Sequence, residues 1–305
     1  IIAFEPSKVA AGYEALFHLD FAALGNSRIW LEAYTQSAWS TGAGWGLLYI
    51  YSTRLPENSH VGNNGISVGV GDQLGALVSA TVVIPALFAL SADPSAAWGA
   101  GNFGLTFIYV SQLFSTMTVG GSLFAFLFFL VLSAAGITSM FAMVEVGAAN
   151  LENMGVGRKK AVLVTGIALF ALGIPSAIWP AFCANQDWVC GIGLLLAGLL
   201  YAFAIIKHGP KKILDEYINT PAAVRVYKIG GWWSLLMRLF PVFFVIIVGW
   251  WLYQSMSWYE TPWNPFLSES TGTVVFQLLA VLLLSFLVTG AIMKKAQKGP
   301  MSVDE

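Results

Sequence analysis

Charged residues are scarce in this sequence. Only 10% of its 305 residues are Asp, Glu, Lys or Arg, whereas a soluble domain carries about 25%. Hydrophobic residues make up 57% of the chain and the mean hydropathy is +0.72. The chain also has 12 Trp, 21 Phe and 10 Tyr, and aromatic residues collect at membrane–water boundaries. This composition excludes a soluble globule and predicts an integral membrane protein.

Cysteine and histidine are also rare. The two cysteines exclude a disulfide scaffold and a multi-cysteine metal site. Cys183 and Cys190 flank a predicted outer loop, where they are either a disulfide or two small apolar side chains. The three histidines lack metal-ligand spacing, and no nucleophile–base pair or phosphate-binding loop is present. We therefore expect no catalytic residues and no enzyme activity, and the net charge of −1 argues against a nucleic-acid partner.

Long apolar stretches dominate what is present. A membrane-crossing helix needs about 20 mostly apolar residues, and seven stretches qualify, which predicts an all-α polytopic membrane protein. They are Arg28–Thr53, Ile66–Leu90, Ser122–Asn150, Lys160–Ala177, Val189–Ile206, Trp232–Tyr253 and Thr273–Met293. Residues 91–121 are too interrupted to span and are expected to form short helices near the membrane surface.

The distribution of Lys and Arg predicts the orientation of the spans. Most of the 15 basic residues fall on one side of the membrane when the spans alternate, and basic loops stay cytoplasmic. We expect residues 1–27 to be an extracellular segment, 28–294 a transmembrane domain with 91–121 as a structured outer loop, and 295–305 a cytoplasmic tail. The N-terminus of this chain is then outside and its C-terminus cytoplasmic.

The first span has an unusual middle. Ser40–Gly46 contains three glycines and two hydroxyl residues, and each glycine costs a helix up to about 1 kcal/mol relative to alanine. The segment is either a site of close helix packing or an unwound break, whose freed backbone groups must find ions or substrate because lipid offers no partner. Glu32 and Gln36 indicate a wet outer vestibule.

Polar residues also occur inside two other spans. Asp72 either faces a cation, a wet cavity or a partner, or extends to the cytoplasmic surface. Thr138 and Ser139 either bond back to their own helix or, with the Ala135 carbonyl, present oxygen atoms suited to a monovalent cation such as Na⁺. Glu145 is expected nearer the cytoplasmic end, on a hydrated pathway or in a helix pair.

Three motifs together resemble the neurotransmitter:sodium symporters. The run Gln36–Gly46 resembles the broken sixth helix of that family, and Ala135–Ser139 resembles the Ala-Gly-Leu-Thr-Ser stretch of its eighth helix. Asp72, thirteen residues before Pro85, falls where the seventh helix carries a sodium-binding Asn or Asp. The chain is thus similar to helices six to twelve of a bacterial member, whose fold has twelve helices built around an inverted repeat.

The resemblance implies two sodium sites. Ser40 and Asp72 would be ligands of the first site. The Ala135 carbonyl, Thr138 and Ser139 would belong to the second.

The resemblance also implies a substrate site beside the helix break. The carbonyls of Trp39 and Ser40 would receive the ammonium group of an amino acid, the Trp39 ring would close over it, and Gln36 would belong to the outer gate. The residues implied to line the side-chain pocket are Thr41, Gly42, Met140 and Met143, and the methionines favour a hydrophobic amino acid.

Chloride is not expected as a co-ion. In chloride-dependent members a hydroxyl lies four residues after the sodium ligand of helix seven, and that position here is Ala76. An ionised Asp72 would balance the sodium charge in place of a bound anion.

The function implied is sodium-coupled symport of an amino acid across the bacterial inner membrane by alternating access. Helices one to five of the family have no counterpart in this chain, so they would come from the same parent chain or from a second polypeptide. The alternative from another class is a non-transporting membrane subunit with a scaffolding or regulatory role. A receptor or channel would leave the glycine-rich segment and the Thr-Ser pair unexplained.

Overall fold

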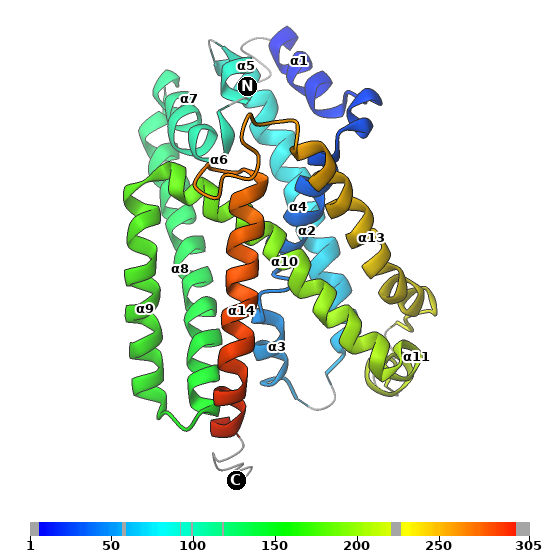
Figure 1. Cartoon of the computed structure of the whole chain (residues 1–305). Coiled ribbons are helices and arrows are strands. Elements are labelled where there is room, and N and C mark those ends of the chain that lie inside the picture. Colours follow the sequence, from blue (N-terminus) through cyan, green and yellow to red (C-terminus); the bar gives the residue numbers. More distant parts are fainter. Residues whose placement is uncertain are drawn as a thin grey trace. The chain divides into compact units, whose positions relative to one another are not determined.

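A computed structural model describes residues 6–56, 59–91, 93–98, 100–117, 119–220 and 227–296. Every regular element in these ranges is a helix (Figure 1), as the long apolar stretches predicted. Most of the predicted cytoplasmic tail, residues 297–305, lies outside the described residues. The predicted extracellular segment contains the helix α1 (Pro6–Phe17) and a 3-10 turn, η1 (Ala22–Gly25).

The chain forms two compact units. The first comprises residues 1–21 and 68–140, and the second residues 22–67 and 141–305. The division passes through two long helices, α4 (Val61–Leu90) and α8 (Gly121–Asn153). Each unit is described by itself.

The first unit packs short helices against α4 and α8. Its core consists of Leu87, Ala97 and Leu113, and a Cβ placed on Gly12 of α1 would lie 2.6 Å from the Cα of Pro85, so α1 approaches α4 closely. The short elements are α5 (Pro94–Trp98), α6 (Gly101–Phe103), the π-helical turn η2 (Gly104–Tyr109) and α7 (Val110–Thr116). The prediction of short helices within residues 91–121 is therefore confirmed.

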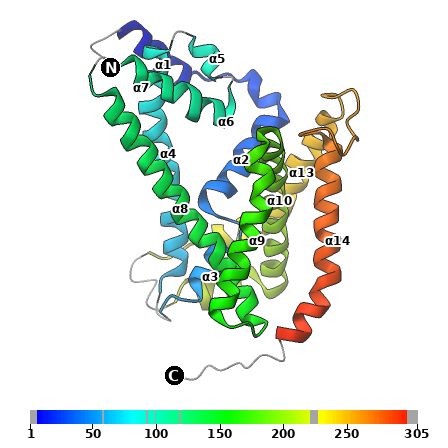
Figure 2. The same cartoon turned by 90° about the vertical axis from the view of Figure 1, so that its left-hand side faces the viewer.

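The second unit is arranged around one central helix, α10 (Pro180–His208). Its neighbours are α2 (Ser27–Thr41), α9 (Arg158–Ile178), α13 (Trp232–Ser255) and α14 (Thr271–Ala296), seen in Figures 1 and 2. The shorter elements are α3 (Leu47–Ser52), α11 (Pro210–Ile213) and the π-helical turn η3 (Leu214–Ile218). Six buried residues from α2, α10, α13 and α14 form the core: Leu31, Val189, Ile192, Leu195, Trp251 and Val274.

Buried hydroxyl groups join α13 to α14. The Oγ of Ser255 and the Oγ1 of Thr271 lie 2.7 Å apart and are hydrogen-bonded. The two residues are 1% and 0% exposed, respectively. Ser255 also donates to the carbonyl of Leu252 at 3.1 Å, so the Thr271 hydroxyl donates to the Ser255 oxygen and depends on it for a bond that water does not replace.

Five of the seven predicted spans are helices long and apolar enough to cross a membrane, by length and composition, among the described residues. They are Val61–Ala89, Gly121–Asn153, Arg158–Ile178, Pro180–His208 and Trp232–Ser255. Within α14 (Thr271–Ala296) the stretch Thr271–Leu287 is a shorter apolar segment, and the first predicted span is interrupted. The number of seven transmembrane helices remains a prediction.

The fifth span begins earlier than predicted. The sequence placed its start at Val189, but α10 begins at Pro180. Proline fits the first position of a helix because the N–H that it lacks would have no partner within the helix there. Cys183 and Cys190 therefore lie on one helix, seven positions and about 10 Å apart along its axis. A disulfide needs Cα atoms less than about 7 Å apart, so these thiols are not paired with each other, and both are free.

Candidate functional site

The first predicted span is broken at its middle, as the glycine pattern indicated. The helix α2 ends at Thr41, and α3 starts at Leu47. Figure 2 shows the non-helical stretch between them. Three glycines carry the break, because Gly42, Gly44 and Gly46 have φ angles of 72°, 82° and 81°, a left-handed conformation that side chains disfavour.

The break also packs tightly against α10, so both interpretations of the glycine-rich segment apply. A Cβ placed on Gly44 would lie 2.8 Å from the carbonyl oxygen of Leu194, too close for any real contact. The amide of Gly42 donates to the carbonyl of Trp39 at 3.3 Å, and the amide of Ile50 to the carbonyl of Gly46 at 3.1 Å. These two bonds cap the half-helices on either side of the break.

A tryptophan just before the break contacts another within it. The rings of Trp39 and Trp45 meet edge to face, with centroids 4.5 Å apart. A Cβ placed on Gly191 would lie 3.1 Å from the Nε1 atom of Trp39, so this ring also rests on α10. The sequence prediction omitted Trp45; the signal available was an aromatic residue inside a run of small ones.

The predicted ligands on α2 are hydrogen-bonded within their own helix. The hydroxyl of Ser40 donates to the carbonyl of Gln36 at 2.9 Å, and that of Thr41 donates to the carbonyl of Ser37 at 2.6 Å. Gln36 and Ser40 are exposed, while Thr41 and Gly42 are half-buried. A hydroxyl that donates still has lone pairs to offer, so these oxygens retain the capacity to coordinate a cation.

The predicted ligands on α8 converge on one carbonyl. Thr138 and Ser139 both donate their hydroxyls to the carbonyl of Ala135, at 2.8 and 3.1 Å. This is the back-bonding alternative, and it gathers three oxygens at one point of an exposed helix face. The neutral lone pairs of this group fit a hard monovalent cation.

Asp72 and the two methionines complete the predicted set. Asp72 is half-buried on α4 and accepts a bond of 3.3 Å from Nε2 of Gln73. Met140 is exposed on α8, and Met143 on the same helix is half-buried. The residues of the first unit are Asp72, Ala135, Thr138, Ser139 and Met140, and those of the second are Gln36, Trp39, Ser40, Thr41, Gly42 and Met143.

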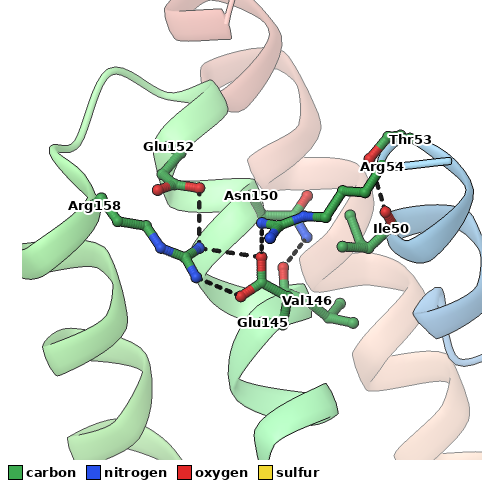
Figure 3. Close-up of polar contacts among 8 residues, drawn as sticks. All are labelled: Ile50, Thr53, Arg54, Glu145, Val146, Asn150, Glu152 and Arg158. Carbon is green, nitrogen blue, oxygen red and sulfur yellow. Dashed lines mark hydrogen bonds and ion pairs between the residues drawn. The ribbon is translucent and has the colours of Figure 1, made fainter. Parts of the chain in front are cut away.

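An ion-pair cluster lies beyond α3 in the second unit (Figure 3). The carboxylate of Glu145, only 16% exposed, pairs with Arg54 and, at 2.6 Å, with Arg158. Arg158 also pairs with Glu152 at 3.3 Å. The cluster joins the segment that follows α3 to α8 and α9. Of the two roles that the sequence allowed for Glu145, the structure shows helix pairing.

A second cluster holds the start of α2. Nε of Arg28 lies 2.7 Å from Glu32, and its Nη2 lies 3.4 Å from Glu269, which follows α13 in the chain. The guanidinium carbon of Arg28 lies 5.2 Å from the centre of the Trp188 ring on α10, a cation–π contact. Glu32 was recognised from the sequence, but its pairing with Arg28 was not, nor were the contacts of Arg28 with Glu269 and Trp188, which come from distant segments.

The sequence is similar to known sodium-dependent transporters. The profile of the sodium:neurotransmitter symporter family matches residues 7–297. The uncharacterized sodium-dependent transporter MJ1319 of Methanocaldococcus jannaschii is 30% identical over 237 residues, which are 74% of this chain and 46% of the relative. The uncharacterized sodium-dependent transporter YhdH of Bacillus subtilis is 25% identical over 241 residues, 71% of this chain and 50% of the relative.

A human relative has an assigned substrate class in its name. The human sodium- and chloride-dependent neutral and basic amino acid transporter B(0+) is 23% identical over 254 residues, 77% of this chain and 38% of that protein. The chain thus spans about half the length of the curated relatives it matches, or less. Because the family profile covers nearly the whole sequence, the chain belongs to the sodium:neurotransmitter symporter family.

Proposed function

We propose that this chain is part of a symporter that couples Na⁺ entry to uptake of a hydrophobic amino acid by alternating access, in the bacterial inner membrane. The break at Gly42–Gly46 is the observation that carries the proposal. A helix interrupted inside a membrane is tolerated where its backbone lines a cavity or binds a ligand. The sodium-dependent relatives support the coupling ion, and the human relative supports an amino-acid substrate.

In this proposal the end of α2 recognises the ammonium group of the substrate. Carbonyl groups at a helix C-terminus carry partial negative charge, and those of Trp39 and Ser40 stand at this end. Thr41, Gly42, Met140 and Met143 line the pocket for the side chain, and Gln36 forms part of the outer gate. The apolar methionines favour a hydrophobic substrate.

Sodium ions occupy two oxygen-rich sites in the proposed mechanism. Ser40 and Asp72 contribute to one, and the group formed by Ala135, Thr138 and Ser139 contributes to the other. Each Na⁺ that crosses the membrane releases about 2.3 kcal/mol per 100 mV of potential. This energy drives the substrate inward.

The second sodium site is tested by removing its hydroxyls. We expect Thr138→Ala with Ser139→Ala to raise the sodium concentration needed for half-maximal uptake more than it changes substrate affinity. Ser133→Ala, which removes a hydroxyl elsewhere on α8, serves as the matched control and is expected to leave sodium dependence unchanged. An unaltered sodium half-saturation in the double variant would refute this site.

The proposal includes transport without chloride. If Asp72 supplies the negative charge beside sodium, uptake into proteoliposomes is equal in chloride and in gluconate, and Asp72→Asn impairs it. Transport that stops in gluconate and returns with chloride would contradict this, and so would a fully active Asp72→Asn variant in chloride-free buffer.

The proposal also requires further helices as partners, from the same parent chain or from a second polypeptide. We expect the protein in its native membrane to exceed the 32.8 kDa of this chain by about five helices, or to hold a second chain tightly. Intact mass after purification measures this. Sodium-driven uptake by the 32.8 kDa chain alone would show that it needs no such partner.

A further inference from the structure

A small cavity lies next to the helix break, within the second unit. Its volume is 190 Å³, and residues of α2, of the break, of α10 and of α13 line it. Figure 1 shows these helices. Tyr34 and Ala38 contribute from α2, Ala43 and Gly44 from the break, and Phe240 from α13.

Two close contacts form the walls of this cavity. The rings of Tyr34 and Phe240 lie with centroids 5.7 Å apart. A Cβ placed on Gly198 of α10 would lie 3.0 Å from Cζ of Phe240, so this ring lies directly against the backbone of α10. Aromatic rings and helix backbone therefore bound the cavity on these sides, while Ser37 and Ala43 of its lining are exposed, so the cavity opens to the surface of the unit.

The chemistry of the walls excludes charged ligands. None of the lining residues is charged, and only Tyr34 and Ser37 carry a polar side-chain group. The hydroxyl of Ser37 already donates to the carbonyl of Ala33 at 2.9 Å. The lining shares no residue with the proposed substrate site, so the cavity is distinct from that site.

The size of the cavity selects the class of ligand. Pockets for drug-sized molecules measure about 300–1,000 Å³, whereas an engineered apolar cavity of about 150 Å³ in another protein binds benzene or xenon. The 190 Å³ cavity matches the second class.

We propose that this cavity is a binding site for small uncharged apolar molecules of about one aromatic ring, and that an occupant stiffens the break. Ala43 and Gly44 belong both to the cavity wall and to the unwound segment. A molecule that binds only while this wall is in place stabilises the present conformation of residues 42–47 through linkage. Such a ligand acts on the break without competing for the substrate site.

Benzene is the probe for the binding test. The protein is labelled at its alanine methyl groups and studied by NMR in deuterated detergent. Magnetisation transfer from benzene to the Ala38 and Ala43 methyls is expected to saturate as benzene is added. Transfer to the methyl of Ala33, which is on the same helix but outside the cavity lining, is expected to rise without saturation because it comes from benzene dissolved in the detergent.

Two leucine substitutions separate a bound molecule from a dissolved one. Ala38→Leu fills the cavity and is expected to weaken benzene binding, read at Ala43, at least tenfold. Ala33→Leu is the same change outside the cavity and should leave that signal unchanged. A saturable signal at Ala43 that persists in Ala38→Leu, or no saturation in the unmodified protein, overturns the site.

A variant that enlarges the cavity keeps the test decisive if Ala38→Leu fails to fold. Phe240→Leu removes one aromatic wall and is expected to admit naphthalene, with at least tenfold tighter binding than in the unmodified protein. Equal affinity for naphthalene in the unmodified protein and in Phe240→Leu overturns the assignment of Phe240 to the cavity wall.

Amide hydrogen exchange tests the effect on the break. With benzene at ten times its dissociation constant, linkage predicts exchange about tenfold slower at residues 42–47 in the unmodified protein and no slowing in Ala38→Leu. Unchanged exchange despite saturable binding overturns the action on the break. None of these measurements depends on transport, so their failure is distinguishable from failure of the proposed function.

Discussion

The contact between the helix break and α10 makes a quantitative prediction for Gly44→Ala. Gly44 has a φ of 82°, and a Cβ placed on this residue would lie 2.8 Å from the carbonyl oxygen of Leu194. The left-handed conformation costs alanine about 1–2 kcal/mol. Overpacking against a backbone atom that cannot rotate away adds about 1–3 kcal/mol. We therefore expect Gly44→Ala to lower the free energy of unfolding by about 2–5 kcal/mol.

Gly46→Ala is the matched control for this prediction. Gly46 has a φ of 81°, but the nearest atom to its Cβ position is Cγ1 of Val146 at 3.7 Å, an ordinary contact. The free energy of unfolding of this variant should fall only by the cost of the left-handed conformation, about 1–2 kcal/mol. The difference between the two variants isolates the contact with α10.

Titration with SDS in mixed micelles, followed by circular dichroism, measures both free energies. The unmodified protein and the two variants are compared under identical detergent conditions, so the detergent contributes equally. Equal destabilisation by Gly44→Ala and Gly46→Ala would refute the close approach of the break to Leu194. A larger loss for Gly46→Ala would refute it as well.

Three further predictions concern the second unit. Glu145→Gln should lower the unfolding midpoint more than Glu152→Gln, because Glu145 pairs with two arginines and Glu152 with one; equal midpoints would contradict the cluster. Ser255→Ala should cost about 1–3 kcal/mol by leaving the buried Thr271 hydroxyl without its partner. The double variant Ser255→Ala with Thr271→Val should lose less free energy of unfolding than the sum of the losses in the two single variants. Losses that add up fully would argue against the hydrogen bond. Both cysteines of α10 should react with a maleimide in denatured, unreduced protein; protection of both would indicate a disulfide.

The helix break could be predicted from the sequence because its cause is local. Three glycines at alternate positions, Gly42, Gly44 and Gly46, permit left-handed torsion angles that other residues resist. The same applies to the hydroxyls of Thr138 and Ser139, whose bonds to the Ala135 carbonyl are set by the geometry of one helical turn. Neither feature needs information from a distant part of the chain.

The start of α10 could not be predicted in the same way. Asn185, Gln186 and Asp187 look like a polar loop, so the sequence placed the span after them. In the structure Asn185 accepts the backbone amide of Glu269 at 2.7 Å, and Gln186 donates to Gln277 at 3.1 Å. These partners lie 84 and 91 residues away, and they satisfy polar groups that a membrane helix could not otherwise bury.

The sequence by itself determined that this is a helical membrane protein with one interrupted helix. The free energy of moving apolar side chains from water into the membrane, and the backbone torsion angles that glycine permits, depend on single residues or on short runs of residues. The tertiary structure alone decided that Glu145 pairs with Arg54 and Arg158. It alone placed a cavity between Ala43 and Phe240. Ion pairs and cavities depend on how helices far apart in the chain meet, and no local pattern specifies the axial shift and rotation of one helix against another.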